Sequence, residues 1–187
     1  MKAFFETVER FGALRDESKA ALTTVAKRLE LPKGHVLVKA DSVCTHIYFI
    51  EKGLARTYYY KDGRDVTDWL SAENDFVGSI VSFLVQRPDR RIVTLLEPSV
   101  LWAFPHRGLE ELYVHHPELE RLGRLLTGWG FVQLQERFDD LHFATAAQRY
   151  EKLLATHPTF IERVPLGMIA SYLGITSETL SRIRAQV

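Results

Sequence analysis

Side chains suited to recognising a polyanion gather near the C-terminal end of the sequence. They are Thr176, Ser177, Glu178, Thr179, Ser181 and Arg182. Hydroxyl groups can hold phosphate oxygens, an arginine can pair with guanine or a phosphate, and a glutamate can accept a hydrogen bond from the amino group of cytosine. On the exposed face of one helix, such a set predicts contacts with double-stranded DNA.

The residues around this polar set have the spacing of two helices joined by a tight turn. Ala170 is followed by Gly174 four residues later, then by Leu180 and Ile183. Two crossing helices need a small residue at their contact, a turn residue that tolerates a positive φ angle, and apolar residues on the facing sides. This spacing is typical of a DNA-binding helix-turn-helix, whose second helix enters the major groove. The alternative is a small helical subdomain whose polar residues only face water.

The charge of this region is low for a DNA-binding segment. Five basic residues stand against three acidic ones between 145 and 187, namely Arg149, Lys152, Arg163, Arg182 and Arg184 against Glu151, Glu162 and Glu178. The whole sequence balances 24 basic against 24 acidic residues. A single copy would therefore bind DNA weakly at physiological salt, so the DNA hypothesis predicts a homodimer that presents two copies.

Upstream, the sequence patterns predict an α+β protein with an N-terminal jelly-roll β-barrel. Apolar residues follow helical spacing over 2–31, and from Pro32 onward short segments rich in β-branched and aromatic residues alternate with glycine turns. The predicted strands are His35–Val38, His46–Ile50, Leu54–Tyr60, Val66–Leu70 and one or two within Ile92–Phe104. The dipeptide Asp62-Gly63 predicts a tight hairpin, and strands at this spacing suggest a sandwich or jelly roll.

After Pro117 the apolar period returns to that of a helix, which we expect to be long, with the adjacent His115 and His116 at its start. Its first apolar stripe is Leu119, Leu122, Leu126 and Trp129, and its second is Phe131, Leu134, Phe138 and Leu141. Glycines at 123, 128 and 130 favour close approach of a partner backbone, unless the helix bends there. We predict a dimer seam at Leu122, Leu126 and Trp129.

The chain thus divides into a β-roll sensor domain with N-terminal helices over 1–116, a dimerisation helix over 117–143, and an all-α helix-turn-helix domain over 144–187. In the last part, Thr145 and Gln148 predict a capping box at the start of one helix. Thr176 is the predicted N-cap of the final helix.

The sequence contains none of the common motifs for catalysis or metal binding. It has no His-x-His pair, no Gly-x-Ser-x-Gly, no Gly-x4-Gly-Lys loop and no His-Glu-x-x-His. The single cysteine, Cys44, excludes a disulfide within one chain and every site with several cysteine ligands, iron–sulfur clusters included. We expect no catalytic residue, no metal and no cofactor. Haem binding remains an alternative only because six histidines could serve as axial ligands: His35, His46, His106, His115, His116 and His142.

In the order of its parts, the chain resembles the Crp/Fnr superfamily of bacterial transcription regulators. The motifs that carry the resemblance are Pro32-Lys33-Gly34, Ala40-Asp41, Tyr48-Phe49-Ile50 with Gly53, Asp62-Gly63-Arg64, Asp75-Phe76-Val77-Gly78 and the string from Gly174 to Ile183. The resemblance implies a dimer joined by the long helix, with Ser177, Glu178 and Arg182 on DNA, and RNA polymerase as a further partner. Many members add a two-stranded wing after the second helix. This sequence ends five residues after Arg182, so we expect either a wingless domain or a trimmed chain.

The resemblance also implies an effector pocket at Gly78, Ser79, Arg90 and Arg91, with altered chemistry. Members that bind cyclic nucleotides follow the glycine with a glutamate for the ribose hydroxyl, where this chain has Ser79. They also carry an arginine for the cyclic phosphate, and Arg90 and Arg91 lie near that position without the small residues that normally follow. We expect the roll to persist as a fold while cyclic AMP binding is lost, so the effector stays unknown.

The first ten residues lack the apolar run of a secretory signal, and no stretch of about 18 residues is apolar enough to span a membrane. We expect a cytoplasmic protein without membrane contact. The sequence thus predicts a homodimeric DNA-binding regulator that recognises an inverted repeat. The alternative is a ligand- or protein-binding module with a degenerate cyclic-nucleotide-binding fold, and a catalytic jelly roll is a third hypothesis.

Overall fold

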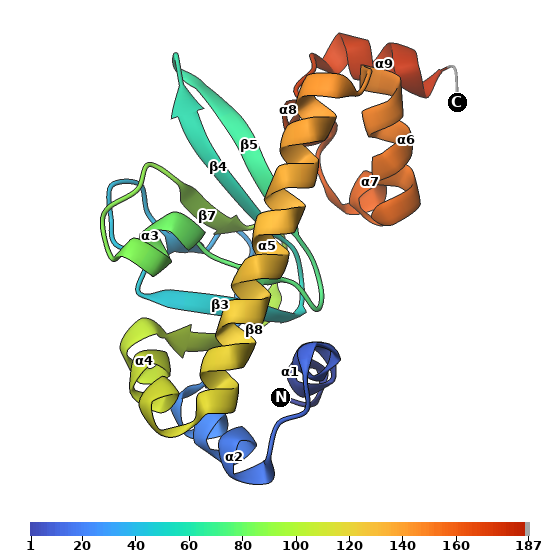
Figure 1. The fold of residues 1–187 in the computed structure, drawn as a ribbon. Helices are drawn as coiled ribbons and strands as arrows, with labels where there is room; N and C mark the ends of the chain where they lie inside the picture. The colour runs from blue at the N-terminus through green and yellow to red at the C-terminus, as the bar shows by residue number, and fades with distance from the viewer. Residues whose placement is uncertain (186–187) are drawn as a thin grey trace.

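Two four-stranded antiparallel sheets form the centre of the computed structural model, which describes residues 1–185 (Figure 1). One sheet has the strand order β1-β8-β3-β6 and the other has the order β2-β7-β4-β5. The strands are β1 Lys27–Leu31, β2 Val36–Val38, β3 His46–Lys52, β4 Ala55–Lys61, β5 Arg64–Ser71, β6 Phe76–Val77, β7 Ile92–Leu95 and β8 Ser99–Pro105. The predicted α+β fold with an N-terminal roll is confirmed.

Alternation along the strands puts one face of each sheet into a shared core. Val93 and Leu95 of β7 and Ala55 of β4 are buried there, and they meet Ile50 and Leu101 from the other sheet. Side chains of a strand alternate between its two faces, so the next residues along β4 and β7 lie on the outer side of their sheet. That outer side is where the C-terminal part of the chain packs.

The N-terminal helical region is shorter than predicted. Helix α1 (Lys2–Val8), the 3-10 helix η1 (Glu9–Phe11) and α2 (Asp16–Val25) are followed by a strand, because β1 pairs with β8 along its whole length. The expectation of helical structure through residue 31 is therefore wrong. Hydrogen bonding to a strand distant in sequence decides the conformation of β1, and local apolar spacing cannot report such a partner.

The sequence patterns miss three further helices: α3 (Ile80–Val85), α4 (His106–His115) and α7 (Phe160–Arg163). His116 is the N-cap of α5, as predicted, but His115 is the last residue of α4, so the prediction that both histidines begin the long helix is wrong for His115. The long helix begins at Pro117, where a proline suits the first turn because its nitrogen has no hydrogen to leave unpaired.

Helix α5 spans Pro117–Phe143, and its first apolar stripe faces the chain's own roll. Leu119 and Leu122 are buried in one core with Phe4 and Leu109, and Leu126 packs against that core. At 27 residues, α5 is about 40 Å long. Among the helices of residues 1–185, none is long and apolar enough to cross a membrane.

The three glycines of α5 have different surroundings. A Cβ atom at Gly123 would lie 2.7 Å from the hydroxyl oxygen of Tyr113, so this glycine makes room for a side chain of the neighbouring helix α4. Gly128 and Gly130 would meet nothing within 4 Å and lie on the open side of α5. Close approach thus explains Gly123 within one chain, and the other two glycines leave space for another molecule.

The C-terminal helices are α6 (Ala146–Thr156), α7, α8 (Leu166–Tyr172) and α9 (Ser177–Arg184). The capping box of Thr145 and Gln148 is confirmed, with both reciprocal hydrogen bonds present. The N-cap role of Thr176 is also confirmed, since its hydroxyl accepts the N–H of Thr179. Both caps satisfy backbone groups that a helix start would otherwise leave unpaired.

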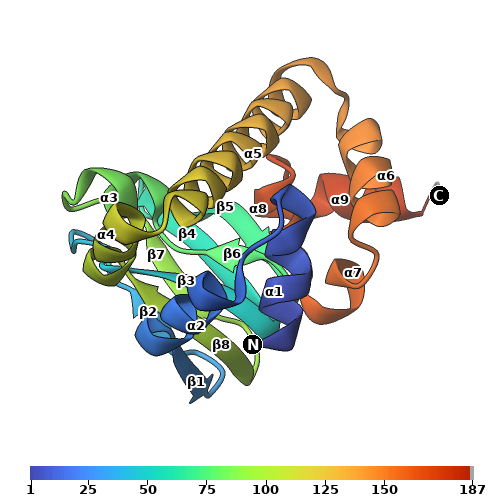
Figure 2. The same cartoon turned by 60° about the horizontal axis from the view of Figure 1, so that its bottom comes forward.

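These helices pack onto the roll. Figure 2 shows α5 running past the roll from α4 to α6, after which the chain folds back so that α8 lies beside β5. One continuous core joins Leu54 and Leu70 of the roll to Leu153, Phe160 and Ile169 of the C-terminal helices. The orientation of the C-terminal helices is therefore set by apolar packing within the chain.

Gly53, between β3 and β4, lies where two segments of the roll approach each other closely. Its φ is +120°, and a Cβ there would lie 2.9 Å from the Cα of Ser99 and closer still to its hydroxyl. We expect Gly53→Ala to lower the free energy of unfolding by about 2–4 kcal/mol, measured by urea denaturation, because φ strain and a backbone clash add. Gly63→Ala is the control: its φ is +74° with nothing within 4 Å, so the loss should be about 1 kcal/mol. Equal losses would contradict the role of the close approach.

Candidate nucleic-acid interface and effector pocket

Helices α8 and α9 are joined by a turn of the kind that the spacing predicts. Gly174 has a φ of +67°, and the N–H of Ile175 donates to the carbonyl of Ala170 at 3.0 Å. Ala170, Leu180 and Ile183 are all buried. The apolar side of α9 is thereby fixed to the core, which turns its opposite side outward.

That outward side carries most of the residues predicted to contact DNA. Ser177, Glu178, Ser181 and Arg182 are exposed, and Thr179 is half-buried. These side chains come from one helix of eight residues, and they form a continuous polar surface without any rearrangement of the chain. The surface matches what a major-groove helix needs, namely hydrogen-bonding groups on a rigid element.

Thr176 and Thr179 also stabilise the start of α9. The Thr176 hydroxyl accepts the N–H of Thr179 at 3.2 Å, and the two hydroxyl oxygens lie 3.1 Å apart. The backbone N–H of Glu178, the Thr176 hydroxyl and the charge of Arg182 lower the pKa of the Glu178 carboxyl. Glu178 is therefore ionised at neutral pH and can only accept hydrogen bonds, which suits a base amino group and not a phosphate.

Of the four residues predicted for an effector pocket, three contact the carboxylate of a fifth residue, Asp89. Its carboxylate accepts hydrogen bonds from the Ser79 hydroxyl at 2.6 Å and from the Arg91 guanidinium at 2.9 Å. The Arg90 backbone N–H also donates to it, at 2.8 Å, while the Arg90 guanidinium lies 5.6 Å from the ring centre of Tyr59 on the surface. Sequence analysis missed Asp89, although an acidic residue directly before two arginines is a signal that could have found it.

Gly78 sits behind this group with no room for a side chain. A Cβ there would lie 3.0 Å from the Cδ1 of Ile47 and 3.5 Å from the carbonyl oxygen of His46. The Arg91 Nε also donates to Asp68 of β5 at 2.6 Å. Two of the four predicted residues, Ser79 and Arg91, thus meet in one polar cluster through their side chains, and Arg90 takes part only through its backbone. Gly78 packs against Ile47 and His46 instead.

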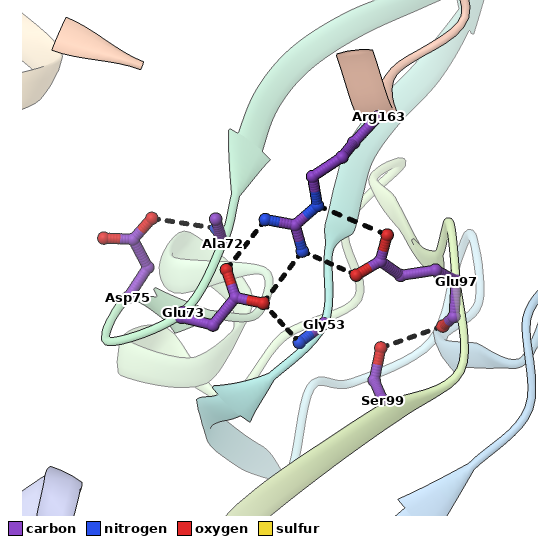
Figure 3. Close-up of polar contacts among 7 residues, drawn as sticks. All are labelled: Gly53, Ala72, Glu73, Asp75, Glu97, Ser99 and Arg163. Carbon is purple, nitrogen blue, oxygen red and sulfur yellow. Dashed lines mark hydrogen bonds and ion pairs between the residues drawn. The ribbon is translucent and has the colours of Figure 1, made fainter. Parts of the chain in front are cut away.

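A second polar cluster, which the sequence did not predict, joins α7 to the roll (Figure 3). Arg163 makes two hydrogen bonds to the Glu73 carboxylate, at 2.9 and 2.8 Å, and also pairs with Glu97. Glu73 additionally accepts the N–H of Gly53 at 2.9 Å. We call Arg163, Glu73 and Glu97 the junction cluster. Its members are up to 90 residues apart in sequence, so no local pattern marks them.

Arg137 of α5 makes a third connection at the same junction. Its guanidinium stacks over the ring of Tyr172, 3.8 Å from the ring centre, and lies 6.0 Å from that of Trp69. It donates to the carbonyl of Tyr172 at 2.8 Å and to that of Asp68 at 3.0 Å. One side chain therefore ties together the long helix, β5 and α8, which positions α9.

The predicted seam residues divide between buried and exposed positions. Leu122 is 7% exposed and Trp129 is 43% exposed, with the Trp129 ring 6.1 Å from that of Phe11 in an edge-on contact. The second stripe is open instead: Phe131, Leu134, Phe138 and Leu141 are all exposed. The structure holds one chain, so the seam stays a prediction, but Leu122 and Leu126 have little surface left for a partner.

Metal ligands do not gather in the described part of the chain. Within residues 1–185 no group of three His, Cys, Asp or Glu side chains could hold a metal ion. The histidines considered as axial haem ligands are spread over several elements, with His46 starting β3, His106 starting α4 and His142 near the end of α5.

Comparison with known proteins agrees with this architecture. Residues 28–116, slightly less than half of the chain, match the cyclic nucleotide-binding domain family. No curated protein matches the chain by sequence.

Solved structures extend the likeness to most of the chain. The structure of FixK2 from Bradyrhizobium japonicum matches with a TM-score of 0.73 at 19% identity, covering 87% of this chain and 84% of that one. A putative Crp/Fnr-family transcriptional regulator from Eubacterium rectale matches with a TM-score of 0.70 at 18% identity, covering 91% and 82%. The c-di-GMP responsive regulator CLP of Xanthomonas campestris matches with a TM-score of 0.68 at 15% identity, covering 92% and 91%. At these identities the likeness establishes the fold, and it confirms the resemblance drawn from the sequence.

The junction cluster predicts a pH-dependent contribution to stability. Burial raises the pKa of Glu73, but hydrogen bonds from Arg163 and from the Gly53 N–H outweigh it and lower the pKa from 4.5 to about 2. As pH falls, the unfolded chain takes up this proton first, so the contribution is complete above about pH 5 and is lost between pH 5 and pH 2. Because Glu73 is partly exposed, we expect Glu73→Gln to cost about 1–2 kcal/mol at pH 7.

The measurement is urea unfolding of wild type and Glu73→Gln from pH 7 to pH 2. The difference between them should shrink steadily below pH 5. Glu111→Gln, which removes the charge of an exposed residue of α4, is the control and should change little. A difference for Glu73→Gln that does not vary with pH would refute the ionic role of the cluster.

Proposed function

From a cyclic nucleotide-binding domain over residues 28–116, carried in a chain with the fold of Crp/Fnr regulators, we propose that this protein is a sequence-specific DNA-binding transcriptional regulator that works as a homodimer. The observation that carries the proposal is the outward polar face of α9, held in place by buried Leu180 and Ile183. In this proposal Ser177, Glu178, Ser181 and Arg182 meet base edges and phosphates. Thr176 and Thr179 stabilise the start of the helix, and their hydroxyls use their remaining hydrogen-bonding capacity to bind phosphate.

Each of the three predicted parts has its own role in this proposal. Residues 1–116 act as the sensor or scaffold, α5 joins two chains, and 144–187 read DNA, of which residues 186–187 lie outside the described part. RNA polymerase and a cytoplasmic location belong to the same proposal. The structures that the chain matches include a global regulator and a putative transcriptional regulator, which supports a binding function over a catalytic one.

The open side of α5 supports the homodimer. Its second apolar stripe, defined by Phe131, Leu134, Phe138 and Leu141, is exposed along the helix. An exposed apolar stripe on a long helix is costly in water and favours pairing with a like surface. We therefore place the dimer seam on this second stripe.

The experiment that tests the proposed function is selection of bound duplexes from a random DNA pool at about 100 mM salt, repeated at higher salt. A dimer with two-fold symmetry should recover an inverted repeat whose half-sites lie about 10 base pairs apart, since its two recognition helices would be about 34 Å apart. Binding that is indifferent to sequence at both salt concentrations would favour the alternative, a module whose terminal helices only pack on the roll.

Arg182 provides the sharpest test of whether the outward polar face of α9 contacts DNA bases. We expect Arg182→Ala to weaken specific binding by about 1–3 kcal/mol while leaving the free energy of unfolding unchanged, because the side chain is exposed. Arg107→Ala is a matched control that removes the same charge from an exposed site on α4. Fluorescence anisotropy on the selected duplex and urea unfolding would be measured for both variants. Equal loss of binding in the two variants, or a loss of stability for Arg182→Ala, would argue against base reading.

The position of the seam can be tested by charge insertion. Leu134 is 58% exposed, so Leu134→Glu should leave the single chain folded but weaken the dimer by about 100-fold or more, because a carboxylate would be buried in an apolar seam. Val114→Glu is the control, since it places the same charge at an exposed apolar residue of α4, outside the stripe. Sedimentation equilibrium measures the dissociation constants.

Trp129→Glu separates the two stripes in the same experiment. If Trp129→Glu yields monomers while Leu134→Glu stays dimeric, the seam lies on the first stripe with Leu122 and Leu126. The reverse result would place it on the second stripe.

A further inference from the structure

We propose that the roll carries its own anion: the carboxylate of Asp89 fills the place where the phosphate of an effector would be held, so that this domain does not respond to cyclic nucleotides or to free phosphate. The inference deepens the proposed function and rests on it only for the position of the effector pocket. Its support comes from the contacts, charges and packing around Asp89.

The groups that converge on Asp89 are those that would hold an oxyanion. A buried serine hydroxyl, a backbone N–H and a guanidinium donate to its two oxygens, from Ser79, Arg90 and Arg91. Ser79 has no exposed surface. Charge-assisted hydrogen bonds of this kind bind carboxylate and phosphate alike, because both present negatively charged oxygens to the same donors. The donor set is complete and its ligand is part of the chain.

The Asp89 segment is also fixed from its other side. The N–H of Asp41 donates to the carbonyl of Asp89 at 2.8 Å, and Ser42 and Asp89 form an isolated antiparallel bridge. These contacts fix the backbone of Asp89, so its carboxylate could leave the site only by a side-chain rotation that breaks the hydrogen bonds from Ser79 and Arg91. The carboxylate is therefore held as a built-in group.

The charge balance of the site opposes a second anion. Arg91 contributes one positive charge, and it is shared between the carboxylates of Asp89 and Asp68, at 2.9 and 2.6 Å. Burial raises the pKa of Asp89, but hydrogen bonds from Ser79 and Arg91 outweigh it and lower the pKa, so the carboxylate is charged at neutral pH. A phosphodiester would meet two negative charges, those of Asp89 and Asp68, and the single positive charge of Arg91.

The same contacts tie three elements of the roll together. Ser79 precedes α3, Arg91 precedes β7 and Asp68 lies in β5. The cluster therefore links three segments of the roll through the side chains of Ser79, Asp89, Arg91 and Asp68.

The test is to remove the built-in anion and ask whether an external one takes its place. Wild type, Asp89→Ala and the double variant Asp89→Ala/Arg91→Ala would be titrated with cyclic AMP, cyclic GMP and inorganic phosphate, using calorimetry and the shift in melting temperature. We expect wild type to bind none of them at millimolar concentration. Asp89→Ala should bind at least one of them about 10-fold or more tightly than wild type, because the Ser79 hydroxyl and the Nη1 donor of Arg91 are freed, and the double variant should lose that gain. Glu111→Ala, which removes the same charge on α4, should behave as wild type.

Micromolar binding of any of the three ligands by wild type would overturn the proposal. No gain for Asp89→Ala over Glu111→Ala would overturn it as well. If Asp89→Ala does not fold, Asp89→Ser, which keeps a short polar side chain, takes its place with the same expected gain. The comparison between cyclic nucleotides and inorganic phosphate shows whether the opened site takes a nucleotide or phosphate alone. None of these titrations contains DNA, so their failure is distinct from a failure of the proposed regulator to bind an operator.

Discussion

The apolar contact between the roll and the C-terminal helices is the constraint on which the rest of the structure depends. Leu54 and Leu70 lie in one core with Leu153, Phe160 and Ile169, so neither part could close its apolar surface without the other. Apolar burial supplies most of the free energy of such a contact, and polar pairs at its rim mainly fix its geometry. The junction cluster and Arg137 have that role here, since each joins elements from both sides of the contact.

This contact gives α5 a particular task. Because the roll and the C-terminal helices are already joined through the core, α5 is not their only connection. Its first stripe closes the core of its own chain, and its second stripe is left open. In a homodimer, the distance between the two α9 helices would then depend on how the open stripes pair, because the position of α9 relative to α5 is fixed within each chain.

Sequence reasoning succeeded where a few neighbouring residues determine the structure. The caps at Thr145 and Thr176 and the turn at Gly174 depend on side chains and backbone angles within a few positions. It failed where a distant partner decides. Strand β1 exists because β8 pairs with it, and Arg163 finds Glu73 only after the chain has folded. Asp89 is intermediate, since its position beside Arg90 and Arg91 was visible but its contact with Ser79 was not.

In the proposed function, the Asp89 cluster and the junction between the roll and the C-terminal helices together limit how the protein can be controlled. An effector can shift a two-state equilibrium only by its difference in affinity for the two states, and a nearly complete shift needs about 5.5 kcal/mol. A phosphate-bearing ligand would have to gain that difference from donors that Asp89 already uses, while the reading helices would have to leave a shared apolar core. In the proposed function, the remaining variable is the pairing of two chains. Dimer formation depends on the concentration of the protein, so the amount of DNA-competent dimer would follow the amount of protein made. Control would then lie in the abundance of this chain and in the affinity of its open α5 stripe.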